Sequence, residues 1–113
     1  MTTLYGIKNC DTVKKARQWL DAAGIAYRFH DFRADGLSAE LLAQWEAALG
    51  WETLLNRRGT TWRKLEDSQR ANLDRDTALA LMQAQPSLIK RPVLDNGTKI
   101  LIGFTPDDYQ KAL

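Results

Sequence analysis

Residues 4–24 read LYGIKNCDTVKKARQWLDAAG, and this stretch decides the fold. Residues 4–7 predict a short strand. A turn with Cys10 follows, and residues 12–23 predict an amphipathic helix because their apolar positions recur at helical spacing. Gly24 suits the position just past a helix end. The stretch therefore predicts a strand, a turn that carries the only cysteine of the chain, and a helix.

Cys10 lies where the predicted helix begins, so unpaired N–H groups and the helix dipole favour its thiolate. A thiol with a pKa of about 8.5 is only ~3% ionised at pH 7. Lowering that pKa to about 6.5 requires about 2.7 kcal/mol, and a helix end supplies ~2 kcal/mol at best. Cations are therefore needed; Lys8 and Lys14 are nearby, and Asp11 opposes them. Position alone also fits an unreactive core thiol.

Residues 25–32 alternate in character and predict a second strand with one apolar face. A strand, a helix and a strand joined by short links form a βαβ unit, so we expect these two strands to be parallel.

The middle of the chain predicts helices separated by polar loops. The segments are residues 41–49 after an N-cap at Ser38, residues 51–55, a basic loop at 56–60, an ambiguous stretch at 62–65, and a helix from Asp74 or Asp76 to about residue 84. We expect this block, about residues 37–85, to be a helical insertion.

The last third predicts a hairpin and a helix. Residues 93–94 and 99–102 are the expected strands, and residues 95–97 (Asp-Asn-Gly) are a strong hairpin turn. Thr105 and Pro106 suit the N-cap and first turn of a final helix. The order β-α-β, helical insertion, β-β-α predicts an α/β, thioredoxin-like fold. We expect a mixed four-stranded sheet and a helical subdomain within a single domain, residues 1–113.

The composition is that of an ordinary globular protein, with 113 residues, 44% hydrophobic and 27% charged. A net charge of +2 is too small to indicate nucleic-acid binding. One cysteine and one histidine exclude an intrachain disulfide and give no metal-ligand spacing. We see neither a signal peptide nor a membrane span, and expect a cytoplasmic protein with no bound metal.

Three stretches carry a resemblance to a known family. They are YGIKNC at residues 5–10, LLNRRGTTWRKL at residues 54–65, and PSLIKRP at residues 86–92 with Gly103-Phe104 after it. The chain resembles the arsenate reductase (ArsC)-like family of thioredoxin-like proteins, in particular its YffB/Spx branch. The resemblance implies that Cys10 is the catalytic cysteine, that Arg91 lines an anion site, and that the bond before Pro92 is cis.

The chain departs from the family pattern at several positions. Asn56 stands at an arginine position of the family, so Arg57 or Arg58 would have to substitute for it, and Gly103 replaces a final arginine. Both changes weaken the case for arsenate, because oxyanions benefit from bidentate guanidinium contacts. Val13 stands where Spx-type switches have a second cysteine. An oxidised Cys10 would therefore need an outside thiol.

The resemblance implies a glutathione-dependent thiol oxidoreductase, similar to arsenate reductase, with a single nucleophilic cysteine. Cys10 and Arg91 are the expected catalytic residues. The expected substrate-binding residues are Asn9, Lys14, Arg57, Arg58 and Pro92. We expect no bound cofactor: glutathione is the co-substrate, glutaredoxin a further partner, and the substrate a small oxyanion or thiol compound. The alternative is a non-enzymatic Spx-like regulator that binds RNA polymerase.

Overall fold

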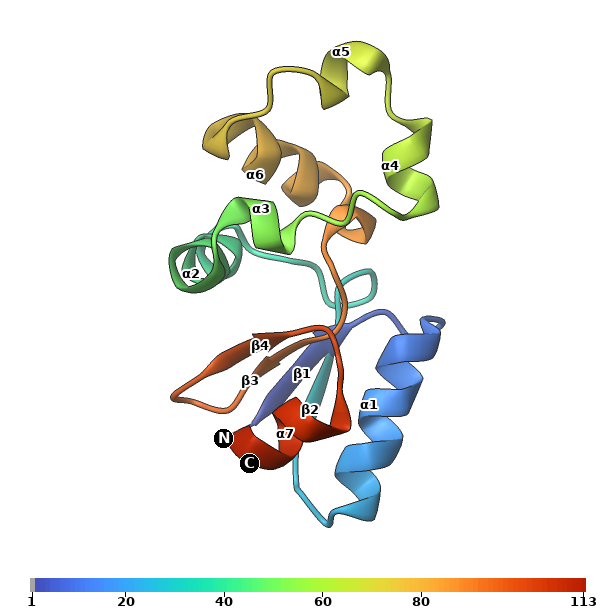
Figure 1. Ribbon diagram of the computed structural model, residues 1–113, viewed down its shortest axis with the longest axis vertical. Helices are drawn as coiled ribbons and strands as arrows, with labels where there is room; N and C mark the ends of the chain where they lie inside the picture. Colours follow the sequence, from blue (N-terminus) through green and yellow to red (C-terminus); the bar gives the residue numbers. More distant parts are fainter. Residues whose placement is uncertain (1) are drawn as a thin grey trace. The chain divides into compact units, whose positions relative to one another are not determined.

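The computed structural model describes residues 2–113, and the chain divides into two units. Unit 1 consists of the residues up to Gly36 together with Arg91–Leu113. Unit 2 is Leu37–Lys90 and is coloured from cyan to orange in Figure 1.

Unit 1 contains the sheet. Its strands are β1 (Thr3–Gly6), β2 (Arg28–Asp31), β3 (Val93–Asp95) and β4 (Ile100–Ile102), in the spatial order β2-β1-β3-β4. β1 is parallel to β2 and antiparallel to β3, and β3 is antiparallel to β4. The expected thioredoxin-like arrangement with a mixed four-stranded sheet is confirmed.

A row of apolar residues crosses the sheet and forms the centre of this unit. The strand register places side by side Phe29, Leu4, Leu94 and Leu101. The row packs with α1 (Asp11–Ala22) and α7 (Pro106–Ala112), the blue and red helices of Figure 1. Ala16 and Leu20 come from α1 and Tyr109 from α7, and all three are fully buried.

β2 is shorter than the strand predicted over residues 25–32. Gly24 has φ +70°, and the N–H of Ile25 donates to the carbonyl of Leu20 at 3.0 Å, so these residues complete the end of α1. At the other end, the chain turns after Asp31, whose side chain accepts the N–H of Arg33 at 2.8 Å. Local hydrogen bonds at both ends therefore make β2 shorter than its alternating sequence pattern predicts.

Unit 2 is helical. Its elements are α2 (Ala39–Leu49), α3 (Trp51–Leu54), α4 (Thr60–Lys64), α5 (Asp67–Arg70), α6 (Arg75–Ala84) and a 3-10 turn at Pro86–Leu88. Ser38 is the N-cap of α2, as expected, and accepts the N–H of Leu41 at 3.1 Å. The ambiguous stretch 62–65 is mostly helical. α5 was not expected, because its four residues depend on a capping box between Glu66 and Gln69.

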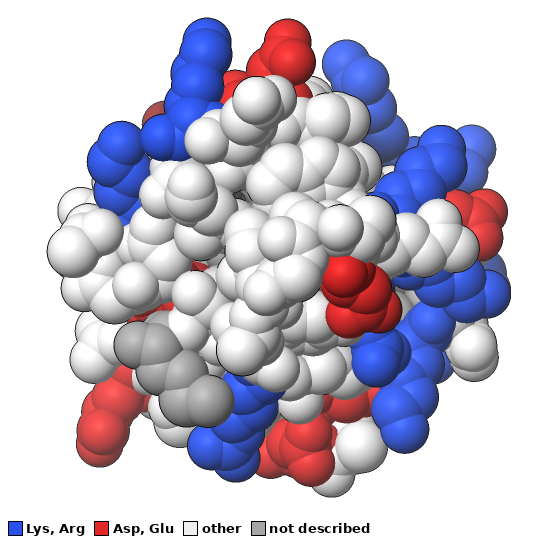
Figure 2. All heavy atoms as spheres, turned by 90° about the horizontal axis from the view of Figure 1, so that it is seen from below, with Lys and Arg blue, Asp and Glu red and all other residues white. Residues whose placement is uncertain are grey.

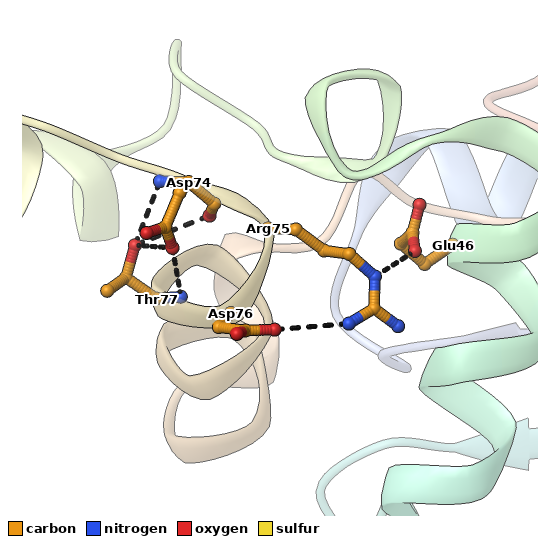
Figure 3. Close-up of polar contacts among 5 residues, drawn as sticks. All are labelled: Glu46, Asp74, Arg75, Asp76 and Thr77. Carbon is orange, nitrogen blue, oxygen red and sulfur yellow. Dashed lines mark hydrogen bonds and ion pairs between the residues drawn. The ribbon is translucent and has the colours of Figure 1, made fainter.

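The start of α6 is fixed by side chains, as Figure 3 shows. Asp74 is the N-cap: its carboxylate accepts the N–H of Thr77 at 2.8 Å, and its own N–H donates to the Thr77 hydroxyl at 3.0 Å. Arg75 donates to Glu46 of α2 at 2.5 Å and to Asp76 at 3.1 Å. The helix therefore begins after Asp74 and not after Asp76. The bond between Arg75 and Glu46 links α6 to α2.

Figure 2 shows one face of the molecule, with Lys and Arg mostly around its edge, Asp and Glu among them, and uncharged residues over its middle. Within residues 2–113, none of the helices has the length and apolar character needed to cross a membrane.

Candidate active site

Cys10 occupies the N-cap of α1, with φ −96° and ψ 125°. Its N–H donates to the carbonyl of Ile7 at 3.2 Å, which closes the turn after β1. Its carbonyl accepts the N–H of Lys14 at 3.0 Å, which opens the helix. The side chain is half-buried and carries a free thiol. The strand and the helix thus place the sulfur at the positive end of the α1 dipole.

The surroundings of the sulfur favour the thiolate. Burial raises the pKa of Cys10, but the N–H of Val13 and the guanidinium of Arg91 lower it more, with a smaller contribution from the N–H of Thr12. The resulting pKa lies below the usual value of a cysteine.

Arg91 reaches Cys10 from a distant part of the sequence. It lies two residues before the start of β3, and its side chain forms a hydrogen bond with the sulfur. The peptide bond between Arg91 and Pro92 is cis, as the resemblance implied. Pro92 is buried, and its carbonyl accepts the N–H of Gly103 at 2.8 Å. The backbone around Arg91 is therefore held by the start of the hairpin.

Asn9 and Lys14 lie close to Cys10 in the chain, and both side chains are exposed. Lys14 was one of the cations expected to act on the thiol. The groups that shift the pKa of Cys10 include Arg91 and not Lys14. A role for Asn9 and Lys14 in binding a substrate stays a prediction.

Arg57 and Arg58 belong to unit 2, where they line a pocket of about 400 Å³. The other residues that line it are Glu52, Leu55, Asn56 and Lys90. Asn56 shapes the loop, since its side chain accepts the N–H of Arg58 at 3.0 Å. The Arg57 guanidinium lies 5.7 Å from the centre of the Trp62 ring. Lys90 is a third cation of this pocket that sequence reasoning missed.

A second pocket of unit 2, about 340 Å³, lies between α5 and α6. Its lining is Ser68, Gln69, Ala71, Asn72, Leu73, Thr77, Ala80 and Leu81. None of these side chains is charged or a thiol, so this pocket offers no strong nucleophile. The described residues 2–113 also contain no group of three or more His, Cys, Asp or Glu arranged to hold a metal ion.

His30 lies in β2 and contacts residues of unit 1. Its ring lies 5.1 Å from the ring of Tyr5, and its Nε2 is 2.7 Å from the carbonyl oxygen of Gly36. Asp31, the next residue, was not singled out from the sequence. Its signal was weak, because an acidic residue at a strand end is usually solvated.

Comparison with known proteins gives a consistent result. The family model described as ArsC family matches residues 5–112. An uncharacterised protein of Haemophilus influenzae is 49% identical over 112 residues, which cover 99% of this chain and 98% of that protein. A solved structure named YFFB protein is 57% identical with a TM-score of 0.97, covering 100% of this chain and 99% of the other.

Two further relatives bear on function. The solution structure of an arsenate reductase (ArsC) related protein from Brucella melitensis is 53% identical with a TM-score of 0.80, covering 97% of this chain and 92% of the other. A protein of Listeria innocua named global transcriptional regulator Spx is 28% identical over 122 residues, covering 100% of this chain and 87% of that protein.

Proposed function

Because this chain belongs to the ArsC family, we propose that it is a glutathione-dependent thiol oxidoreductase with Cys10 as its single nucleophile. One observation carries the proposal: the first-turn N–H groups of α1 and the Arg91 guanidinium act together on the sulfur and lower its pKa. A thiolate at neutral pH is the form that attacks disulfides and oxyanions.

The reaction that fits a single cysteine is the reduction of a mixed disulfide between glutathione and another thiol compound. The Cys10 thiolate attacks the glutathione sulfur, the disulfide bond breaks, and the other thiol leaves and takes a proton. A second glutathione thiolate then attacks the glutathione sulfur bound to Cys10. This step releases oxidised glutathione and restores the Cys10 thiolate, whose lowered pKa makes it a good leaving group. The chain has no second cysteine that could replace the second glutathione.

Arg91 has two tasks in this scheme. Its guanidinium stabilises the Cys10 thiolate before attack and when it leaves, and it attracts the negative charge of the substrate. A small oxyanion could use the same contacts. We favour the mixed disulfide, because Asn56 and Gly103 stand where arsenate reductases of the family would offer further arginines.

Glutathione carries two carboxylates, which suit cations and N–H donors. In unit 1, we propose Lys14 as a cation that binds them, with Asn9 and Pro92 shaping the approach to the sulfur. For Arg57 and Arg58 we propose, separately, that they bind anionic groups in their own pocket of unit 2. Glutaredoxin is the proposed further thiol partner. This chemistry requires a reducing compartment, so we place the protein in the cytoplasm.

The test measures turnover of a glutathionylated peptide with glutathione in excess. We expect Cys10→Ser to abolish turnover and Arg91→Ala to lower kcat by roughly 10²–10³-fold, the usual effect of removing a charge-stabilising donor. Arg91→Lys keeps the charge but loses the fork, so it should recover part of the rate. Arg28→Ala, an exposed arginine of β2, is the matched control.

Alkylation of Cys10 with iodoacetamide across pH provides the independent check. The rate should follow a pKa below that of a free thiol, and Arg91→Ala should raise that pKa. A Cys10 that titrates like a free thiol would defeat the catalytic proposal. Parallel assays with arsenate as the substrate distinguish the oxyanion reaction from disulfide reduction.

The second candidate is a regulatory protein that binds RNA polymerase. It is favoured by the full-length similarity to a protein named global transcriptional regulator Spx. Binding of purified chain to purified RNA polymerase, with Cys10→Ser as the variant that lacks the nucleophile, tests it. Submicromolar binding by both forms, with no turnover by the unmodified chain, would favour this candidate over the enzyme.

A further inference from the structure

Asp31 is the one charged side chain that is buried among residues 2–113, with 6% of its surface exposed. It ends β2, in register with Gly6 at the end of β1. An ionised carboxylate is stable in such a place only when hydrogen bonds replace its water. The hydrogen-bond partners of the Asp31 carboxylate therefore indicate its role.

The Asp31 carboxylate accepts hydrogen bonds from backbone N–H groups of two segments. Two come from the turn after β2: Arg33 at 2.8 Å and Ala34 at 3.2 Å. The third comes from Lys8, which lies in the turn after β1, two residues before Cys10. The side chain of Asp31 thus joins the end of β2 to the segment that carries the thiol.

The contact with Lys8 replaces a bond of the sheet. In the parallel pair, alternate residues of β1 face β2, and the last such bond runs from the N–H of Phe32 to the carbonyl of Gly6 at 2.8 Å. The next position in this alternation is Lys8, in the turn after β1. β2 has already turned away at that point, and the Asp31 carboxylate takes the place of the missing strand acceptor.

We propose that Asp31 is a positioning residue, which fixes the turn between β1 and α1 so that Cys10 meets the first-turn N–H groups and Arg91. The turn is also held by the hydrogen bond from the N–H of Cys10 to the carbonyl of Ile7. This inference rests on the proposed function, because it assigns Asp31 to the reactive state of that thiol.

Charge alone does not explain the arrangement. A second negative charge near a thiol disfavours its thiolate, and Asp31 is absent from the groups that act on the Cys10 sulfur. Asp31 instead faces the Lys8 ammonium and, through its own N–H, the Asp35 carboxylate at 3.1 Å. Burial raises the pKa of Asp31, but the N–H groups of Arg33, Ala34 and Lys8 lower it more, so the carboxylate is ionised at neutral pH.

The first test uses the unmodified protein and NMR during an acid titration. We expect the backbone amide protons of Lys8, Arg33 and Ala34 to shift together, with one apparent pKa below that of a free aspartate. A Lys8 amide that ignores this titration would overturn the inference. The measurement requires no activity, so it remains valid even if the proposed function fails.

The second test compares Asp31→Asn with Asp35→Asn, which removes the same charge at the same strand end. Loss of charge alone would lower the pKa of Cys10 in both variants. Loss of positioning raises it in Asp31→Asn only, because asparagine keeps one acceptor oxygen for three N–H groups. We expect alkylation of Cys10 at neutral pH to slow several-fold in Asp31→Asn and to be unchanged or faster in Asp35→Asn. A fall or no change of the pKa in Asp31→Asn would contradict the proposal.

Discussion

Cys10 and Arg91 show how a single residue gains reactivity from a distant one. The α1 N–H groups come with the local sequence, since any residue at this N-cap would meet them. The guanidinium is supplied by the segment before β3, which reaches the turn only once the sheet has formed. Burial raises the pKa of Cys10, and the tertiary contact with Arg91 therefore decides whether the net pKa is lowered.

The lowered pKa of Cys10 predicts how stability depends on pH. Between the folded and the unfolded pKa, the unfolded chain binds more protons than the native one, so the free energy of unfolding rises with pH. The gain is complete above the unfolded pKa and is lost as the pH falls through the folded pKa. Urea unfolding across this interval should show the rise in the unmodified chain and not in Cys10→Ser. Parallel curves for the two proteins would contradict the prediction.

Tyr109 offers a second prediction at this scale. Its ring packs edge-on against Trp19 and Phe104, with centroids 5.6 and 4.8 Å away, while its buried hydroxyl has no hydrogen-bond partner among residues 2–113. Tyr109→Phe keeps the ring contacts and removes the desolvated hydroxyl. We expect a free energy of unfolding that is unchanged or higher by up to about 2 kcal/mol. Tyr109→Leu, which loses the ring contacts, should lower it. Destabilisation by Tyr109→Phe would show that the hydroxyl is satisfied in solution.

At the scale of elements, β1 and α1 pack very closely next to the thiol. Gly6 ends β1, and a Cβ built on it would lie 2.7 Å from Cγ2 of Val13. Val13 is fully buried in the first turn of α1, and its N–H is one of the groups that act on Cys10. A glycine is needed here for space, not for an unusual backbone angle.

Gly6→Ala tests this packing. The added methyl group must push Val13 away, and overpacking of this kind typically costs about 1–3 kcal/mol. We also expect a raised pKa of Cys10, because the Val13 N–H moves with the helix start. The double variant Gly6→Ala/Val13→Ala should recover part of both losses. If the two substitutions are simply additive in urea unfolding, the contact is not what requires glycine.

On the scale of the whole molecule, the chain forms unit 1 from two segments and unit 2 from the residues between them. Thr12, Val13 and Arg91, the residues that lower the pKa of Cys10, all belong to unit 1. The core of unit 2 is formed by other residues, and those buried in α2 and α6 are Leu42, Trp45, Ala78 and Met82. Stability of unit 2 and reactivity of the thiol should therefore respond to different substitutions.

Met82→Ala examines this separation. Met82 is fully buried, and its truncation should lower the free energy of unfolding by about 2–5 kcal/mol. The pKa of Cys10, measured by alkylation under conditions where the protein stays folded, should not change. Met82→Leu, which keeps the volume, is the control and should cost less than about 1.5 kcal/mol. A shifted thiol pKa in folded Met82→Ala would show that unit 2 sets the reactivity of Cys10.

The sequence by itself determined the order of the main elements and the place of the thiol. Apolar periodicity gave β1, α1 and α2, and local cap residues such as Ser38 and Thr105 gave helix starts, because these signals depend on neighbours a few residues apart. Only the tertiary structure decided what surrounds the sulfur. The Arg91 contact and the link from Asp31 to Lys8 join segments that meet through strand pairing. Strand pairing between distant segments does not change the apolar periodicity of either segment, so neither segment alone predicts it.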